Sequence, residues 1–228
     1  ERLKILADIG PLHHPEAELL LDYAAGKASQ AASVLVATHL ALCLECRQRV
    51  REYEAIGGAL MESTPPVALS GDALSSVMAR LDQTWEEEAP KPAPVVDEET
   101  LRLVPEPLRS YLSAGIEALP WKTRGLGVRE AVLDLGDPSV RTSLIRIAPG
   151  RKILSHTHGE VERTMVLKGA YNDSTGRYAR GDVAVGTPEL DHTPVAEMGE
   201  ECLCLTVVEG GLQFTGRFSR LLNPLMPR

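Results

Sequence analysis

A dense pattern of glycine, histidine and glutamate marks the C-terminal half of this chain. Gly150 is followed after five residues by His156-x-His158, then after three residues by Glu162 and after six more by Gly169. Because alternate residues of a strand face the same side, His156 and His158 are expected to point together into a β-barrel. Glu162 lies an even step further on and joins them if the strand persists.

His192, on a later expected strand, completes a set of three imidazoles and one carboxylate. Such a set is borderline in softness and holds Zn, Mn, Fe or Ni, so the metal stays open. Four protein ligands also leave a coordination position for chemistry or sensing. We therefore expect a metal site made of His156, His158, Glu162 and His192. The alternative is a set of surface histidines that are unrelated in space.

The rest of the chain from residue 101 onward reads as short β-rich runs separated by Gly, Pro, Asn and Asp. Several short strands with no long helix between them favour an antiparallel sandwich or barrel. The expected strands are residues 128–133, 141–147, 163–167, 182–185 and 202–208. Cys202 and Cys204 share one face of the last strand. They are interpreted as small buried thiols, with a redox sensor near the metal as the alternative.

The first ninety residues show helical spacing of apolar residues instead. Pro15 suits the first position of one helix, and Ser29 suits the N-cap of the next. A third helical stretch runs through Cys46 and Leu60 and ends at Pro65-Pro66.

A second candidate metal site lies in this helical part. His39, Cys43 and Cys46 form H-x3-C-x2-C, and on one helix they fall within roughly 60° of one another. Structural zinc takes four N or S ligands, and the only other histidines before residue 150 are His13 and His14. Metal binding commonly stabilises helical units of this size. Two other interpretations remain: chance cysteines on a buried helix, and a redox switch.

An amphipathic helix follows Pro65-Pro66, starting near Gly71 or Asp72. Its apolar residues recur at helical spacing and are Leu74, Val77, Met78, Leu81 and Trp85. They form either a core helix or a stripe reserved for a partner. An acidic, Pro-rich stretch then predicts a linker. We expect domains at 1–88 and 101–228, with the linker at 89–100.

Charge limits the choice of partner. The net charge is −8, and residues 1–88 hold 7 Lys and Arg against 14 Asp and Glu. This acidity disfavours direct binding to nucleic acid and favours a basic protein partner. The longest uncharged stretch, residues 28–44, is too short and too polar to span a bilayer, so no membrane partner is expected. With no signal-peptide pattern and only four cysteines, a cytoplasmic protein is predicted.

Both patterns resemble known families. The pattern from Gly150 to Gly169 resembles the first cupin motif, and His192 resembles the histidine of the second, although Leu190 and Ala196 depart from that motif. His39, Cys43 and Cys46 with an upstream histidine resemble the zinc-binding anti-sigma domain. A zinc anti-sigma domain followed by a cupin is the layout of the ChrR family of anti-sigma factors.

The resemblance implies a multidomain α + β protein: a small zinc-bound helical bundle with a detached fourth helix, then an antiparallel cupin barrel. It implies that the protein is not an enzyme. Instead, the protein would inhibit an extracytoplasmic-function sigma factor and release it under oxidative or photo-oxidative stress. The fourth helix would wrap the sigma factor. Zinc would bind both sites, with His14 rather than His13 in the first. The alternative function is a metal-dependent cupin oxygenase or isomerase with a helical accessory domain.

Overall fold

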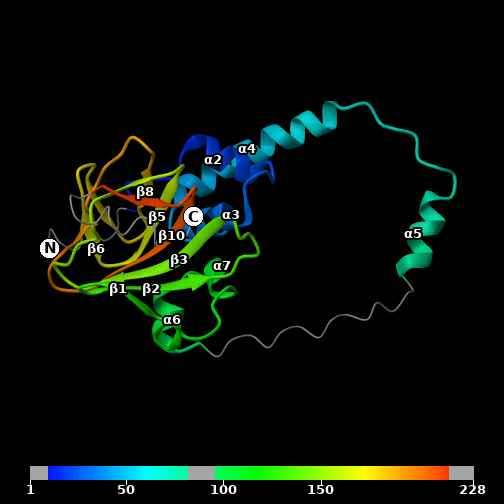
Figure 1. Ribbon diagram of the computed structural model, residues 1–228. Helices are drawn as coiled ribbons and strands as arrows, with labels where there is room; N and C mark the ends of the chain where they lie inside the picture. The colour runs from blue at the N-terminus through cyan, green and yellow to red at the C-terminus, as the bar shows by residue number, and fades with distance from the viewer. Residues whose placement is uncertain (1–9, 82–95, 216–228) are drawn as a thin grey trace, which may run out of the picture.

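The computed structural model describes residues 10–81 and 96–215. Helices come first and strands follow, as the sequence predicts (Figure 1). The first helices are α2 (Ala17–Ala24), α3 (Gln30–Leu40), α4 (Leu44–Ser63) and α5 (Ala73–Leu81). Ser29 is the N-cap of α3, since its hydroxyl accepts a hydrogen bond from the Ala32 amide at 3.2 Å. Pro15 lies before α2 rather than at its first position, because Glu16 is the N-cap.

The prediction that His39, Cys43 and Cys46 lie on a single helix is wrong. Helix α3 ends at Leu40, the chain turns, and α4 begins at Leu44. Cys43 is the N-cap of α4, and its sulfur accepts a hydrogen bond from the Cys46 amide at 3.4 Å. The turn brings these residues together from two helices instead of from one helical face.

Two short helices and a 3-10 turn lead into the β-domain. They are α6 (Glu98–Leu103), α7 (Glu106–Arg109) and η2 (Ile116–Ala118). The strands that follow are β1 (Lys122–Gly125), β2 (Val128–Leu133), β3 (Val140–Ile147), β4 (His156–His158), β5 (Glu162–Lys168), β6 (Ala170–Asn172), β7 (Arg177–Ala179), β8 (Val183–Gly186), β9 (Val195–Ala196), β10 (Cys202–Glu209) and β11 (Leu212–Phe214). All their pairings are antiparallel, as predicted.

The largest sheet has the order β1-β2-β3-β10-β5-β8, and two smaller sheets, β11-β4 and β7-β6-β9, lie beside it. Each face of the large sheet contributes to a separate core. One face packs on α3, α6 and α7 through a cluster that includes Leu35, Leu108 and Leu205. The other face lines the interior of the β-domain with Val166, Cys204 and their neighbours. The helical domain therefore packs directly on the outside of this sheet.

Helix α5 stands away from this body (Figure 1). Its four large apolar side chains are half to three-quarters exposed, namely Leu74, Val77, Met78 and Leu81. Trp85, predicted to extend the same stripe, lies outside the described residues. Among the helices that the structure describes, none is long and apolar enough to cross a bilayer.

Candidate metal centres

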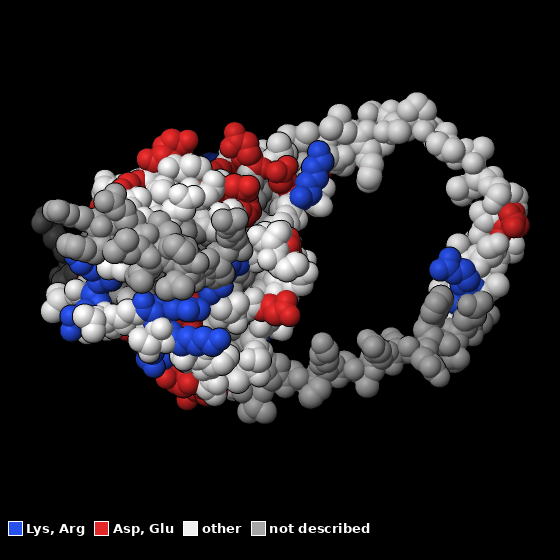
Figure 2. Space-filling model, viewed as in Figure 1, with Lys and Arg blue, Asp and Glu red and all other residues white. Residues whose placement is uncertain are grey.

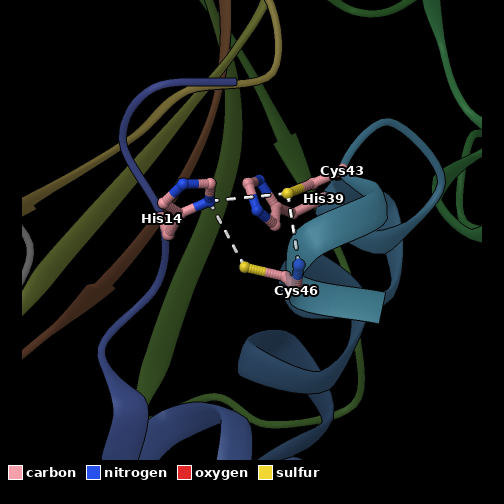
Figure 3. Close-up of side chains that lie close together, drawn as sticks. All are labelled: His14, His39, Cys43 and Cys46. Carbon is pink, nitrogen blue, oxygen red and sulfur yellow. Dashed lines mark hydrogen bonds between the residues drawn. The ribbon is translucent and has the colours of Figure 1, made fainter. Parts of the chain in front are cut away.

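The first centre joins three segments of the helical domain (Figure 3). His14 comes from the segment before α2, His39 from the end of α3, and Cys43 and Cys46 from the start of α4. One ligand atom from each of the four lies within 4.8 Å of all the others. His14 Nδ1 is 3.5 Å from the Cys43 sulfur and 3.3 Å from the Cys46 sulfur. The predicted set of four thus converges on one point.

His13, the other candidate for the upstream histidine ligand, lies elsewhere. The ring of His13 packs against Tyr178, with ring centroids 4.5 Å apart. His14 is the histidine that the structure brings to the two sulfurs.

The hydrogen bonds of His39 leave one ring nitrogen ready to bind a cation. Its Nδ1–H donates to the Gly181 carbonyl at 2.8 Å, so Nε2 carries the lone pair. That Nε2 is buried and has no hydrogen-bond partner in the described chain. Burial, together with nearby His14, lowers the pKa of His39 to about 4, although the Gly181 hydrogen bond acts in the opposite direction. The imidazole is therefore neutral at pH 7. A buried, unpaired nitrogen is costly unless a ligand satisfies it.

The two cysteines are free and buried. Burial and the neighbouring Cys43 sulfur raise the pKa of Cys46 to about 12. Without a cation, the Cys46 thiol therefore stays protonated at neutral pH. A bound metal ion reverses that preference, because thiolates are the form that ligates. Two imidazoles and two thiols, closed from solvent on most sides, form the donor set of a structural zinc site.

The second centre lies inside the β-domain, where His156, His158 and His192 come within 4.8 Å of one another. His156 and His158 project from β4, and His192 forms an isolated bridge with His156. The strand does not persist to Glu162 as the even spacing required, because the chain bends after His158 and a new strand, β5, begins at Glu162. The Glu162 carboxylate nevertheless lies 3.4 Å from His158 Nδ1.

The histidine hydrogen bonds of this centre also point to a cation. His156 Nδ1–H donates to the Leu154 carbonyl and His192 Nδ1–H to Asp173, each at 2.8 Å. Their Nε2 lone pairs then face each other at 3.2 Å, and neither nitrogen of His158 has a hydrogen-bond partner in the described chain. Opposed lone pairs repel unless a positive charge lies between them. The residues therefore fit a metal ion.

Two carboxylates support this cluster differently. Burial works to raise the pKa of Glu162, but His158, His156 and the Thr164 hydroxyl outweigh it and the pKa is lowered. Burial likewise opposes ionisation of Asp173, yet His192 and Thr175 lower its pKa to about 2. Asp173 orients His192 in the way that carboxylates commonly orient metal-binding histidines.

Sequence reasoning missed Asp173, Gly181 and Asp182. Asp173 is a turn residue, and its carboxylate accepts hydrogen bonds from the backbone amides of Thr175 and Gly176. These local bonds give no sign that the carboxylate also reaches His192. Its role becomes visible only once β6 and the His192 segment are brought together.

The cavity beside the second centre is small. It has a volume of about 30 Å³ and is bounded by Glu162, His192, Asp173 and threonine side chains on one part and by apolar side chains on the rest. This volume admits a water molecule or two. Pockets for organic ligands start at about 300 Å³. Cys204 lies on the wall, and its sulfur is 3.6 Å from that of Cys202. Contact with Cys202 and burial raise the pKa of Cys204 well above its ordinary value.

The fold and the two clusters define a class: a helical His/Cys domain joined to a cupin with a histidine cluster. Comparison with known proteins identifies the family. Residues 111–210 match the ChrR cupin-like domain family. The chain is 43% identical to anti-sigma-E factor ChrR of Cereibacter sphaeroides over 212 residues, which cover 93% of this chain and 96% of that protein.

A solved structure agrees in fold. It is the crystal structure of Rhodobacter sphaeroides SigE in complex with the anti-sigma ChrR, and it matches with a TM-score of 0.73 and 42% identity over 87% of this chain and all of that one. The chain belongs to the ChrR family of anti-sigma factors. It is therefore a regulator and not an enzyme.

Proposed function

We propose that the chain inhibits an extracytoplasmic-function sigma factor by binding it through residues 1–88. One observation carries this proposal: the apolar face of α5 has no packing partner in the described chain, and Leu74 and Leu81 are at least 70% exposed. Exposed apolar stripes at helical spacing mark docking surfaces for proteins. The SigE complex of the related ChrR supplies the kind of partner.

Further apolar residues extend this surface toward the body. Ile56, Leu60 and Met61 of α4 and Val67 and Leu69 of the following loop are all more than half exposed. In the view of Figure 2, acidic side chains gather on the side of the body from which α4 leaves, and basic ones lie mostly on the side of β1 and β2. A basic partner fits the acidic side by charge complementarity.

The two centres have separate roles in this proposal. Zinc at His14, His39, Cys43 and Cys46 holds the helical domain in its binding shape. Zinc, or Mn, Fe or Ni, at His156, His158, Glu162 and His192 belongs to the cupin domain, residues 101–228, which is needed for release under oxidative or photo-oxidative stress. Residues 89–100 link the two domains. Chemistry on an organic substrate has no support, because the 30 Å³ cavity is too small for one.

The test is binding by calorimetry between the purified chain and each extracytoplasmic-function sigma factor of its own genome. We expect one of them to bind, and the double variant Leu74→Gln, Met78→Gln to weaken that binding at least tenfold. These side chains are exposed, so the fold is retained. Leu126→Gln, which changes a leucine 86% exposed in the β-domain, is the matched control. If no sigma factor binds, or if the α5 variant binds as tightly as the control, the proposed interface is wrong.

A further inference from the structure

The loop that precedes β8 belongs to the cupin domain, yet it contacts the first metal centre. The Gly181 carbonyl accepts the hydrogen bond from His39 Nδ1, across 142 positions of sequence. His39 is fully buried at this contact. The bond fixes which nitrogen of His39 carries the proton and the direction in which the other nitrogen points.

Gly181 permits this contact because it lacks a side chain. Its φ is +93°, a conformation that L side chains rarely adopt, and a Cβ there would lie 2.6 Å from Cγ of Pro11. The N-terminal segment and the loop before β8 are therefore packed closely together at Gly181 and Pro11.

Asp182 holds the segment that leads into His14. Its Oδ1 accepts hydrogen bonds from the amides of Leu12 at 2.6 Å and His13 at 3.0 Å, while Oδ2 accepts one from Ala179 at 2.8 Å. The Val183 amide donates to the His13 carbonyl at 3.0 Å. Asp182 is 4% exposed, so these bonds are shielded from water. The backbone on the N-terminal side of His14 is thus fixed by the cupin domain.

Strand β8, which follows Asp182, reaches the second centre at its C-terminal end. Gly186 pairs with Glu162 across β5 and β8, and a Cβ on Gly186 would lie 2.5 Å from His158 Nε2. The loop before β8 therefore contacts the first ligand set, and the last residue of β8 contacts the second.

We propose that Asp182 is a positioning residue for the first metal centre, and that Gly181 and Asp182 make metal retention there depend on docking of the cupin domain. This inference rests on the metal binding proposed above. Some groups hydrogen-bond to metal-binding histidines and fix their orientation. Mutation of such a group typically lowers metal affinity 10- to 100-fold. Gly181 is such a group for His39, and Asp182 fixes the backbone that leads into His14. Both residues come from the other domain, so a displacement of the β8 loop loosens both His39 and His14.

The test uses the full chain loaded with Co²⁺. Sulfur-to-cobalt charge-transfer absorbance reports on the first centre alone, because the second has only nitrogen and oxygen ligands. In Asp182→Asn, the side-chain NH2 group faces either the Ala179 amide or the Leu12 and His13 amides, depending on its orientation. In both orientations a donor faces a donor, so at least one hydrogen bond is lost. We expect this variant to lose the absorbance to an added chelator about 10 to 100 times faster than the unmodified chain.

Asp137→Asn is the matched control, since Asp137 also accepts turn hydrogen bonds but accepts them from Ser139 and from no residue of either centre. Equal rates for Asp182→Asn and the control, with unchanged circular dichroism, would overturn the inference. If Asp182→Asn does not fold, Leu12→Pro removes one donor from the N-terminal side, and the same comparison decides. If the unmodified chain shows no sulfur-to-cobalt absorbance, the metal centre itself is wrong, which separates that failure from this one.

Discussion

Nη2 of Arg163 lies 3.0 Å from Oε1 of Glu16, so an ion pair joins the cupin sheet to the residue that precedes α2. Arg163 is one position after Glu162 on β5. Because side chains alternate along a strand, Glu162 faces the second centre and Arg163 faces the helical domain. Both side chains of the pair are largely buried, with 12% and 28% exposed. The pair therefore stabilises the docking of the two domains.

Glu16→Gln removes the charge from this pair while keeping the shape of the side chain. We expect the free energy of unfolding to fall by about 1 to 2 kcal/mol, because a partly buried, hydrogen-bonded pair contributes more than an exposed one. Denaturant unfolding of the metal-loaded chain measures the loss. Glu18→Gln, which changes another acid at the start of α2 without an ion pair in the described chain, is the control. Equal losses in the two variants would mean that the Arg163 contact contributes nothing.

The long strands could be read from the sequence with good accuracy. The bounds predicted for β2 are those observed, those for β3 and β10 differ by one residue at one end, and those for β5 and β8 differ by one residue at both ends. These strands are runs of β-branched and apolar residues bounded by turn residues, which specify them locally. Strands of two or three residues, such as β6 and β9, are too short to show any periodicity.

The candidate ligands could also be read from spacing, but their supports could not. His39 and Gly181 are 142 positions apart, and His192 and Asp173 are 19 apart in different segments between strands. Such contacts depend on how the domains and strands pack, which no local pattern encodes. The turn between α3 and α4 was missed for a related reason: Ala41 and Leu42 are not helix-breaking residues.

Changing both Cys43 and Cys46 to serine removes the sulfur ligands of the first centre. We expect the purified chain to lose one of two bound metal ions and to lose sigma-factor binding, because small helical units commonly need their metal to fold. Elemental analysis and calorimetry measure the two effects. The control changes Cys202 and Cys204 to serine, which removes the same number of buried thiols and keeps the first centre. A serine variant at 43 and 46 that keeps both metal ions would rule out this ligand set.

Asp173→Asn weakens the second centre through His192. Asparagine keeps an acceptor for the His192 Nδ1–H but lacks the charge, so we expect metal affinity at this centre to fall about 10- to 100-fold. Sigma-factor binding should change less than threefold, because the proposed interface lies on the helical domain. Asp134→Asn, another turn-capping aspartate, is the control. A large loss of sigma-factor binding in a folded Asp173 variant would contradict the separation of roles.

Glu130 ties three strands together on the face of the large sheet that also carries Val128 and Ile145. Its carboxylate accepts hydrogen bonds from Arg124 of β1 at 2.6 Å, from Arg141 of β3 at 2.8 and 3.0 Å, and from the Ser143 hydroxyl at 2.7 Å. Burial works to raise its pKa, but Arg141, Ser143 and Arg124 outweigh burial and the pKa is lowered.

A lowered folded-state pKa means that the unfolded chain binds the proton more readily. The contribution of Glu130 to stability is therefore complete above the ordinary pKa of 4.5 and is lost as pH falls below it toward the folded pKa. We expect Glu130→Gln to lower the free energy of unfolding by about 1 to 3 kcal/mol at pH 7. Its stability should then depend less on pH below 4.5 than that of the unmodified chain. Urea unfolding at several pH values measures both effects, with the exposed Glu200→Gln as control. Parallel pH profiles for Glu130→Gln and the unmodified chain would show that the arginine contacts do not favour the ionised carboxylate.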